Sequence, residues 1–234
     1  MTVFQKQDFA IYLQKYGINL NDRQQKQFQR YADLLVEWNQ KMNLTAITEE
    51  NAIYEKHFLD SILPLSDISI QGKLCDVGAG AGFPSLPMKI IQPQLQVTII
   101  EPLGKRITFL NHLCKELQLD VELINERAEI WAKEQREIYD VVTARAVANL
   151  PMLSELCIPF VKKKGYFLAM KGAEGYQENE AAKHAVACLG CEFQGGFEHE
   201  LSDGSKRINL LYKKCSETPK RYPRAFAKIK KQPL

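Results

Sequence analysis

The chain has 234 residues and lacks any apolar run near the roughly 20 residues that cross a bilayer. Its first residues, Met1 to Asp8, lack the apolar core of a signal peptide. Its six cysteines are scattered, and several lie inside apolar runs, a usage typical of buried reduced thiols. These absences predict a cytoplasmic protein with no membrane partner.

The sequence also lacks a second pair of metal ligands. Cys188 and Cys191 form a single C-x-x-C, and no further ligands stand at matching spacing. We therefore predict no metal site. Internal repeats and low-complexity linkers are missing as well, and the length suits one large domain or one domain with an extension.

Hydrophobic periodicity divides the chain near residue 70. Before it, apolar residues recur at helical spacing after the cap pair Asn21-Asp22, and Thr48 is expected to cap a further helix that ends near Pro64. After it, apolar runs alternate with amphipathic segments, as in a mostly parallel sheet with crossover helices. The expected strands cover residues 73–77, 96–101, 120–125, 139–144 and 165–171, followed by an antiparallel pair at 191–198 and 207–213. The expected helices of this part cover residues 104–117, 151–162 and 174–190.

This pattern predicts the α/β class, with a Rossmann-like, mostly parallel sheet and an antiparallel C-terminal strand. We expect an N-terminal helical extension over residues 1–70, packed on a core over 71–215, and a basic tail over 216–234.

A glycine loop follows the first expected strand. Asp76 ends that strand, and Gly78, Gly80 and Gly82 follow in the order G-x-G-x-G, whereas a dinucleotide fingerprint is G-x-G-x-x-G. Phe83 occupies the place of the third glycine, where a bulky ring would hinder the approach of a pyrophosphate. Glu101 closes the next strand, where it can accept two ribose hydroxyls. The loop therefore favours S-adenosylmethionine, which has no phosphate, and Asp76 is expected to orient either the loop or the cofactor's amino group.

Cations follow the later strands. Lys105, Arg127, Arg145 and Lys171 each stand within a few residues of a strand's carboxyl end, the edge where open α/β sheets bind ligands. We expect Arg145 and Lys171 to serve the active site, and Lys105, Arg127 and Lys171 to contact RNA.

The C-terminal tail carries six basic residues and no acid. With its two aromatic rings, this composition suits contact with a polyanion, although a solvated, frayed tail explains it equally well. Since every expected cofactor contact lies upstream, loss of residues 220–234 should leave cofactor binding intact. The cations are Lys220, Arg221, Arg224, Lys228, Lys230 and Lys231.

Taken in order, several short segments resemble those of the glucose-inhibited division protein B (RsmG) family. The resemblance runs from about residue 20 to the C-terminus, and only the tail departs from it, since Ala225-Phe226-Ala227 lacks the family's glycine. The matching segments are Asn43 to Ile47, His57 to Ser61, Asp76 to Pro84, Arg127 to Glu129, Thr143 to Val147, Lys171-Gly172 and Tyr222 to Arg224.

The resemblance implies a class I methyltransferase fold and transfer of a methyl group from S-adenosylmethionine to N7 of one guanine in 16S rRNA of the small ribosomal subunit. It implies cofactor contacts at Gly78, Phe83, Ala128, Glu129 and Arg145. Guanine N7 has a free lone pair, so direct in-line transfer needs no general base. We expect the enzyme to act as a monomer.

Three polar residues of the helical extension are candidates for the target-base side, namely Asn43, His57 and Asp60. We include Asn43 and Asp60 with Arg145 and Lys171 as catalytic candidates, although helix caps or satisfied polar groups explain the extension's residues equally well. Two other classes of function stay open: a dinucleotide-dependent oxidoreductase, and a noncatalytic RNA-binding protein on a methyltransferase fold.

Overall fold

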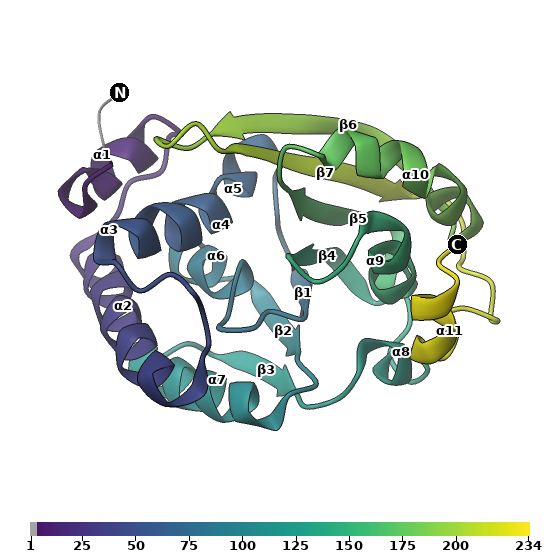
Figure 1. Ribbon diagram of the computed structural model, residues 1–234, viewed down its shortest axis with the longest axis horizontal. Helices are drawn as coiled ribbons and strands as arrows, with labels where there is room; N and C mark the ends of the chain where they lie inside the picture. Colours follow the sequence, from purple (N-terminus) through teal and green to yellow (C-terminus); the bar gives the residue numbers. More distant parts are fainter. Residues whose placement is uncertain (1–3) are drawn as a thin grey trace.

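A seven-stranded mixed sheet forms the centre of the computed structural model, which describes residues 4–234 (Figure 1). The strands lie in the order β3-β2-β1-β4-β5-β7-β6. β1 to β5 are parallel, whereas β7 is antiparallel to both of its neighbours. The strands are β1 (Lys73–Val77), β2 (Gln96–Ile100), β3 (Val121–Ile124), β4 (Tyr139–Arg145), β5 (Val161–Lys171), β6 (Cys191–Glu200) and β7 (Lys206–Lys214).

The chain order of the strands reverses between β1 and β4. The first three strands extend the sheet in one direction from β1, and the chain then returns to place β4 on the other side of β1. In open α/β sheets, ligands bind outside the carboxyl ends of the strands at such a switch point. We therefore expect the ligand-binding residues in the loops that follow β1, β2 and β4.

Helices cover both faces of the sheet, and each face has its own apolar core. One face carries η1 (Lys6–Asp8), α1 (Phe9–Gln14), α2 (Asp22–Met42), α3 (Glu50–Ile53), η2 (Tyr54–Leu59), α4 (Asp60–Ile62), α5 (Pro64–Asp67), α6 (Ser85–Ile91) and α7 (Gly104–Leu117). The other carries α8 (Ala128–Trp131), α9 (Leu150–Cys157), η3 (Ile158–Phe160), α10 (Gly175–Cys188) and α11 (Phe226–Lys231).

The N-terminal helices pack into the same core as α6 and α7. The Tyr31 hydroxyl donates to the carbonyl of Ala81 at 2.6 Å, and the Gln24 amide donates to that of Ile90 at 2.8 Å. Since both carbonyls belong to the glycine loop or the helix after it, the extension supports the loop directly. Among residues 4–234, no helix combines the length and apolar character that a membrane crossing needs.

The structure confirms the predicted sheet, including the antiparallel pairing of β6 with β7. One helix is shorter than predicted: α9 ends at Cys157, and a 3-10 turn and then β5 take up residues 158–162. Pro159 explains this end, because a proline has no backbone N–H for a helix interior.

The helix expected after Thr48 differs in two ways. Its cap is Glu49, whose carboxylate accepts the backbone N–H groups of Asn51 and Ala52 at 3.0 and 2.7 Å. The predicted end at Pro64 also differs from the structure, because Pro64 is the first residue of α5. A proline fits the first turn of a helix, where its missing N–H would have no partner. Between α3 and α4 the chain follows the π-helical segment η2, a form that is frequent at functional sites.

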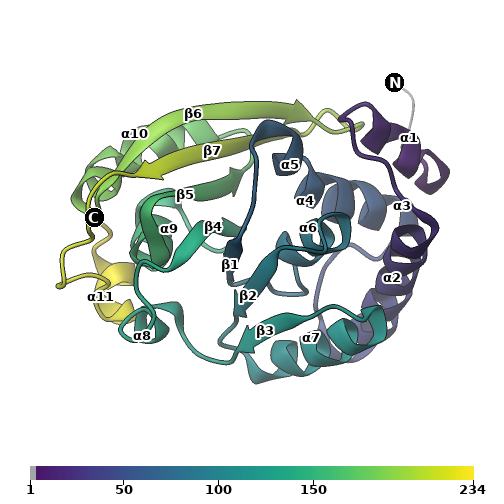
Figure 2. The same cartoon turned by 180° about the vertical axis from the view of Figure 1, so that it is seen from behind.

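The C-terminal tail is docked on the domain, so the expectation of a solvated, frayed tail is wrong. Tyr222 and Ile229 are buried. The guanidinium of Arg224 donates to both carboxylate oxygens of the fully buried Glu155, at 2.9 and 2.6 Å. Arg224, which we expected to contact RNA, therefore forms an ion pair within the protein. Figures 1 and 2 both place α11 beside α8 and α9.

We expect Arg224→Ala to lower the free energy of unfolding by about 3 kcal/mol, because it leaves a buried carboxylate without its charged partner. Urea denaturation measures the change. The matched control is Lys220→Ala, an exposed cation of the same segment, which should change stability by less than about 0.5 kcal/mol. Equal stability of the two variants would contradict a structural role for the pair.

Candidate functional site

Two neighbouring cavities open at the carboxyl ends of the parallel strands. The first, of about 350 Å³, lies over β1 and β2 and includes Gly78 and Glu101 in its lining. The second, of about 710 Å³, lies over β4 and β5 and includes Arg145 and Lys171. Ala146 and Val147 line both cavities, so the loop after β4 is a shared wall. We name them the Glu101 cavity and the Arg145 cavity.

The Glu101 cavity combines two buried carboxylates, Glu101 and Glu129, with apolar walls. Glu101 is 1% exposed, and it accepts the backbone N–H groups of Gly80 at 3.1 Å and Leu103 at 3.0 Å. Arg106 also donates to Glu101 at 3.3 Å, and since a carboxylate offers about four lone-pair sites, acceptor capacity remains for one ligand hydroxyl. The apolar walls come from the side chains of Ile100, Leu103, Ala128, Met152, Leu156 and Phe226. This set suits a nucleoside, with a ribose at Glu101 and a base between apolar surfaces.

The glycine loop leaves space that a side chain would fill. Gly78 has a φ of +75°, and a Cβ there would lie 2.9 Å from the Val147 side chain. Glycine is therefore required where the loop lines the Glu101 cavity, and Gly80, with a φ of +62°, keeps its N–H directed at Glu101. The residues present fit a cofactor that lies against bare main chain.

Asp76 and Phe83 lie beneath the loop and outside the cavity lining. Asp76 is fully buried, and its carboxylate accepts the N–H of Ser85 at 3.0 Å, while its other oxygen has no hydrogen-bond partner. The ring of Phe83 stacks on Tyr31 and on His57, with centroids 5.3 and 4.4 Å apart. Both residues hold the loop in place, and direct cofactor contact by either stays a prediction.

The α8 side of the Glu101 cavity brings together three predicted residues, Arg127, Ala128 and Glu129. The Arg127 guanidinium donates to the Glu129 carboxylate at 2.6 Å and lies over the ring of Phe226, 4.0 Å from its centroid. Arg127 therefore faces the cofactor cavity and the tail, and its predicted RNA contact has no support in these contacts.

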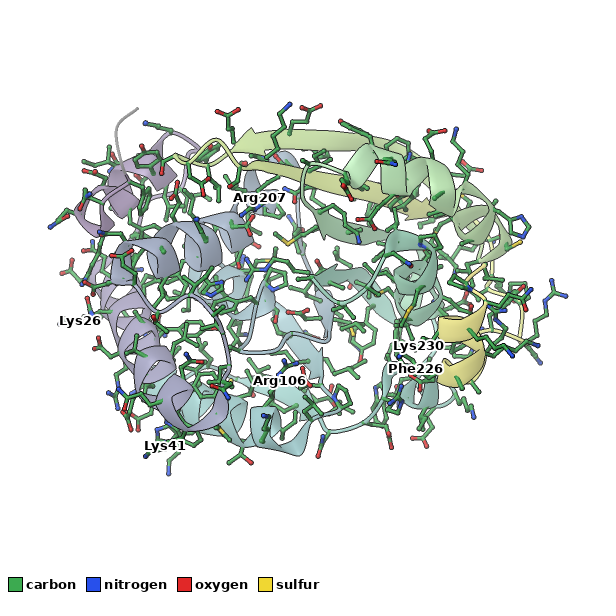
Figure 3. All side chains as sticks on the ribbon, in the orientation of Figure 1. Lys26, Lys41, Arg106, Arg207, Phe226 and Lys230 are labelled. Atoms are coloured by element: carbon green, nitrogen blue, oxygen red, sulfur yellow. The ribbon has the colours of Figure 1, made fainter. Side chains whose placement is uncertain are left out.

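The Arg145 cavity is built around a buried ionic cluster. The Arg145 guanidinium donates to Asp60 at 2.9 Å, and Asp60 also binds the guanidinium of Arg207 at 3.1 Å. Arg145 also lies over the Phe83 ring, 5.0 Å from its centroid. Figure 3 shows Arg207 near the end of the β6–β7 hairpin. The cluster joins α4, β4 and β7, and it carries one net positive charge.

His57 is neutral in this environment. Burial, reinforced by the charge of Arg145, lowers the pKa of His57 to about 3. An arginine can only donate, so Nδ1 of His57 accepts from Arg145 at 3.3 Å. Nε2 therefore carries the proton and donates to the Thr45 hydroxyl at 2.9 Å. The imidazole thus positions Arg145 without adding a second positive charge.

Lys171 holds the shared wall. Its ammonium donates to the carbonyl of Ala148 and to the carboxylate of Glu178, both at 2.7 Å, and its side chain is only 8% exposed. Ala146 has a φ of +56°, which is strained for a residue other than glycine. The contacts of Lys171 favour a role in positioning this loop over contact with RNA.

Asn43 and Lys105 also lie outside both cavities. Asn43 is exposed and ends α2 in the left-handed conformation, with a φ of +50°, which asparagine tolerates. The helix end accounts for its presence, and nothing places it beside a reacting base. Lys105 is exposed, and its ammonium donates to the carbonyl of Met42 at 3.3 Å.

Sequence reasoning missed several lining residues, and three of them matter for the site, namely Arg106, Arg207 and Phe226. Arg106 donates to Glu101 at 3.3 Å and is labelled on α7 in Figure 3. Arg207 had no sequence signal, because only the pairing of β7 with β5 brings it to Asp60. Phe226 lay in the tail that was assigned to RNA, although its place in a conspicuous aromatic and basic segment gave a partial signal.

Comparison with known proteins identifies close relatives. The model of the GidB family, described as rRNA small subunit methyltransferase G, matches residues 24–208. The ribosomal RNA small subunit methyltransferase G of Staphylococcus saprophyticus is 50% identical over 227 residues, and that of Staphylococcus aureus strain RF122 is 52% identical over the same length. Each alignment covers 95% of both chains.

Among known structures, the likeness is one of fold. M. jannaschii TYW2, crystallised with AdoMet, is 15% identical, has a TM-score of 0.54, and aligns over 67% of this chain and 76% of its own. The YcgJ protein of Bacillus subtilis is 12% identical, has a TM-score of 0.51, and aligns over 68% of this chain and 100% of its own.

The buried Asp76 gives a test of the loop's electrostatics. Burial raises the pKa of Asp76 to about 7. Between about pH 4 and pH 7, the folded protein thus keeps a proton that the unfolded chain releases, so this group makes stability fall as pH rises. Asp76→Asn lacks this group and therefore lacks this loss of stability. We expect the difference in free energy of unfolding, variant minus unmodified protein, to increase by roughly 3 kcal/mol from pH 4 to pH 7.

Urea denaturation at pH 4, 5.5 and 7 measures this difference. His57 contributes the opposite slope, because its lowered pKa favours the unfolded chain below pH 6.5, but it does so in both proteins and cancels. The control is Asp120→Asn at an exposed acid. A difference that stays flat for Asp76→Asn would contradict a protonated aspartic acid beneath the loop.

Proposed function

The chain belongs to the GidB family of rRNA small subunit methyltransferases, and on that premise we propose that it transfers the methyl group of S-adenosylmethionine to N7 of a guanine in 16S rRNA. The partner is then the small ribosomal subunit or its RNA, so the proposed location is the cytoplasm. Action as a monomer stays a prediction.

One observation carries the proposal: the two cavities share a wall. The Glu101 cavity has the carboxylate, bare glycine loop and apolar sides that suit S-adenosylmethionine. The Arg145 cavity is larger and carries cations that suit a base with its phosphates. Methyl transfer requires donor and acceptor to meet at near-attack distance. Because the cavities adjoin at Ala146 and Val147, a cofactor in one and a base in the other would be neighbours, as that requirement demands.

Bound S-adenosylmethionine supplies a methyl group on a positively charged sulfonium. Guanine N7 attacks with a free lone pair, so the chain's own residues have no proton to remove. The purine becomes positive during transfer, and a neutral His57 avoids opposing that charge. The Arg145 guanidinium, fixed by Asp60 and His57, is available to a phosphate or to guanine O6. Because the A-form major groove is too narrow for side chains, we propose that the guanine is splayed out.

We expect Arg145→Lys to lower methyl transfer about 100-fold, because a lysine keeps the charge but loses the planar fork that Asp60 and His57 hold. Mass mapping of 16S rRNA after incubation with S-adenosylmethionine measures the transfer. The control is Lys206→Ala, an exposed cation next to Arg207. Full activity of Arg145→Lys with a normal melting temperature would remove Arg145 from the proposed mechanism.

We expect Glu101→Ala to weaken binding of S-adenosylmethionine about tenfold, because it removes the proposed acceptor for a ribose hydroxyl. Isothermal titration calorimetry measures the affinity. Glu126→Ala, an acid outside the cavity lining, is the control. If both variants bind with unchanged affinity, the ribose lies elsewhere, and absorbance of a copurified nicotinamide or flavin would instead favour an oxidoreductase.

A further inference from the structure

We propose that the C-terminal segment completes the cofactor site, with the ring of Phe226 as a binding surface for the adenine base. The inference rests on the proposed function, because it concerns the same cavity. It also revises the expectation that all cofactor contacts lie upstream of the tail. Phe226, the first residue of α11, lines the Glu101 cavity.

The position of Phe226 is fixed on both sides along the chain. Two residues before it, Arg224 pairs with the buried Glu155. Three residues after it, on the same side of the short helix, Ile229 is buried in the apolar core. Further upstream, the Arg136 guanidinium donates to the carbonyls of Tyr222 at 2.7 Å and Thr218 at 3.0 Å. The ion pair, the core packing and these hydrogen bonds therefore hold the Phe226 ring at the cavity.

The surroundings of the ring suit a purine. Arg127 lies over Phe226 at 4.0 Å from the ring centroid and is itself held by Glu129, so the ring is braced from the α8 side. Phe226 remains only half-buried, and the cavity is the space that it helps to enclose. A purine presents a flat π-face, and aromatic side chains bind such faces by stacking without sequence preference. Phe226 of α11 and Arg106 of α7 both line the cavity, and Figure 3 labels these two residues.

The chemistry at the two ends of the cavity agrees with this placement. Glu101 lies at the end of β2, where we propose the ribose, while Phe226 joins Met152 and Leu156 of α9 in an apolar surface. Adenine is the apolar, flat part of S-adenosylmethionine, and it has no charge for Glu101 to meet. We therefore assign the base to the apolar surface and Phe226 to its tail-derived side.

Calorimetric titration with S-adenosylmethionine tests the assignment. We expect Phe226→Ala to weaken binding about tenfold, Phe226→Leu to weaken it by a smaller factor, and Phe226→Tyr to keep the original affinity. The control is Phe193→Ala, an exposed phenylalanine on β6 outside the cavity lining. Unchanged affinity of Phe226→Ala would overturn the inference. Failure of the unmodified protein to bind at all would instead overturn the proposed function.

Trypsin digestion gives a second measurement that needs no variant. If Phe226 contributes to binding, bound cofactor must stabilise the docked tail by the same factor, since coupling between two equilibria is reciprocal. We expect saturating S-adenosylmethionine to slow cleavage at Lys228, Lys230 and Lys231 about tenfold, and to have no such effect on Phe226→Ala. Equal cleavage rates with and without cofactor in the unmodified protein would overturn the inference, even if Phe226→Ala folds poorly.

Discussion

A buried carboxylate between two guanidiniums is the constraint on which the rest of the site depends. Asp60 comes from the N-terminal helical part, Arg145 from the end of β4 and Arg207 from β7, and all three meet within 3.1 Å. An unpaired charge at a buried position is strongly destabilising, so only an arrangement that brings these elements together satisfies Asp60. The same arrangement builds one side of the Arg145 cavity, and the stacked ring of His57 extends it to Phe83 beneath the glycine loop.

The sheet was predictable from the sequence because its signals are local. An apolar run such as Val97 to Ile100 identifies a buried strand without knowledge of its neighbours, and Gly78 and Glu101 follow directly from the ends of such runs. The Asp60–Arg207 pair was not predictable, because it depends on β7 lying next to β5. Likewise, the basic composition of the tail indicated a polyanion contact, whereas Glu155, the residue that holds Arg224, lies far away in the sequence.

For two residues at this edge of the sheet, the sequence predicted the location correctly, but their contacts indicate different roles. Arg145 and Lys171 were both expected at the active site, and both line the Arg145 cavity. Their contacts differ: Arg145 ends in a cluster at the cavity, whereas Lys171 holds the carbonyl of Ala148. Ala146 is strained, and strain of this kind persists only where the surrounding structure determines the backbone. Lys171 restrains this loop at the carbonyl of Ala148, and the bare backbone of Gly78 leaves room for the Val147 side chain beside it. The wall between the cavities is therefore fixed by contacts on both sides.

The C-terminal helix α11 carries two kinds of side chain. On α11, Phe226 and Ile229 face the domain, while Lys228, Lys230 and Lys231 are exposed. The same short helix can therefore close the cofactor cavity with its apolar side chains while its lysines remain exposed. Phosphate contact by these lysines stays a prediction, because they carry the same charge in a docked and in an undocked tail and so do not by themselves favour docking. The proposed closure of the cofactor cavity depends on the docked position of α11, which the buried pair of Arg224 and Glu155 holds.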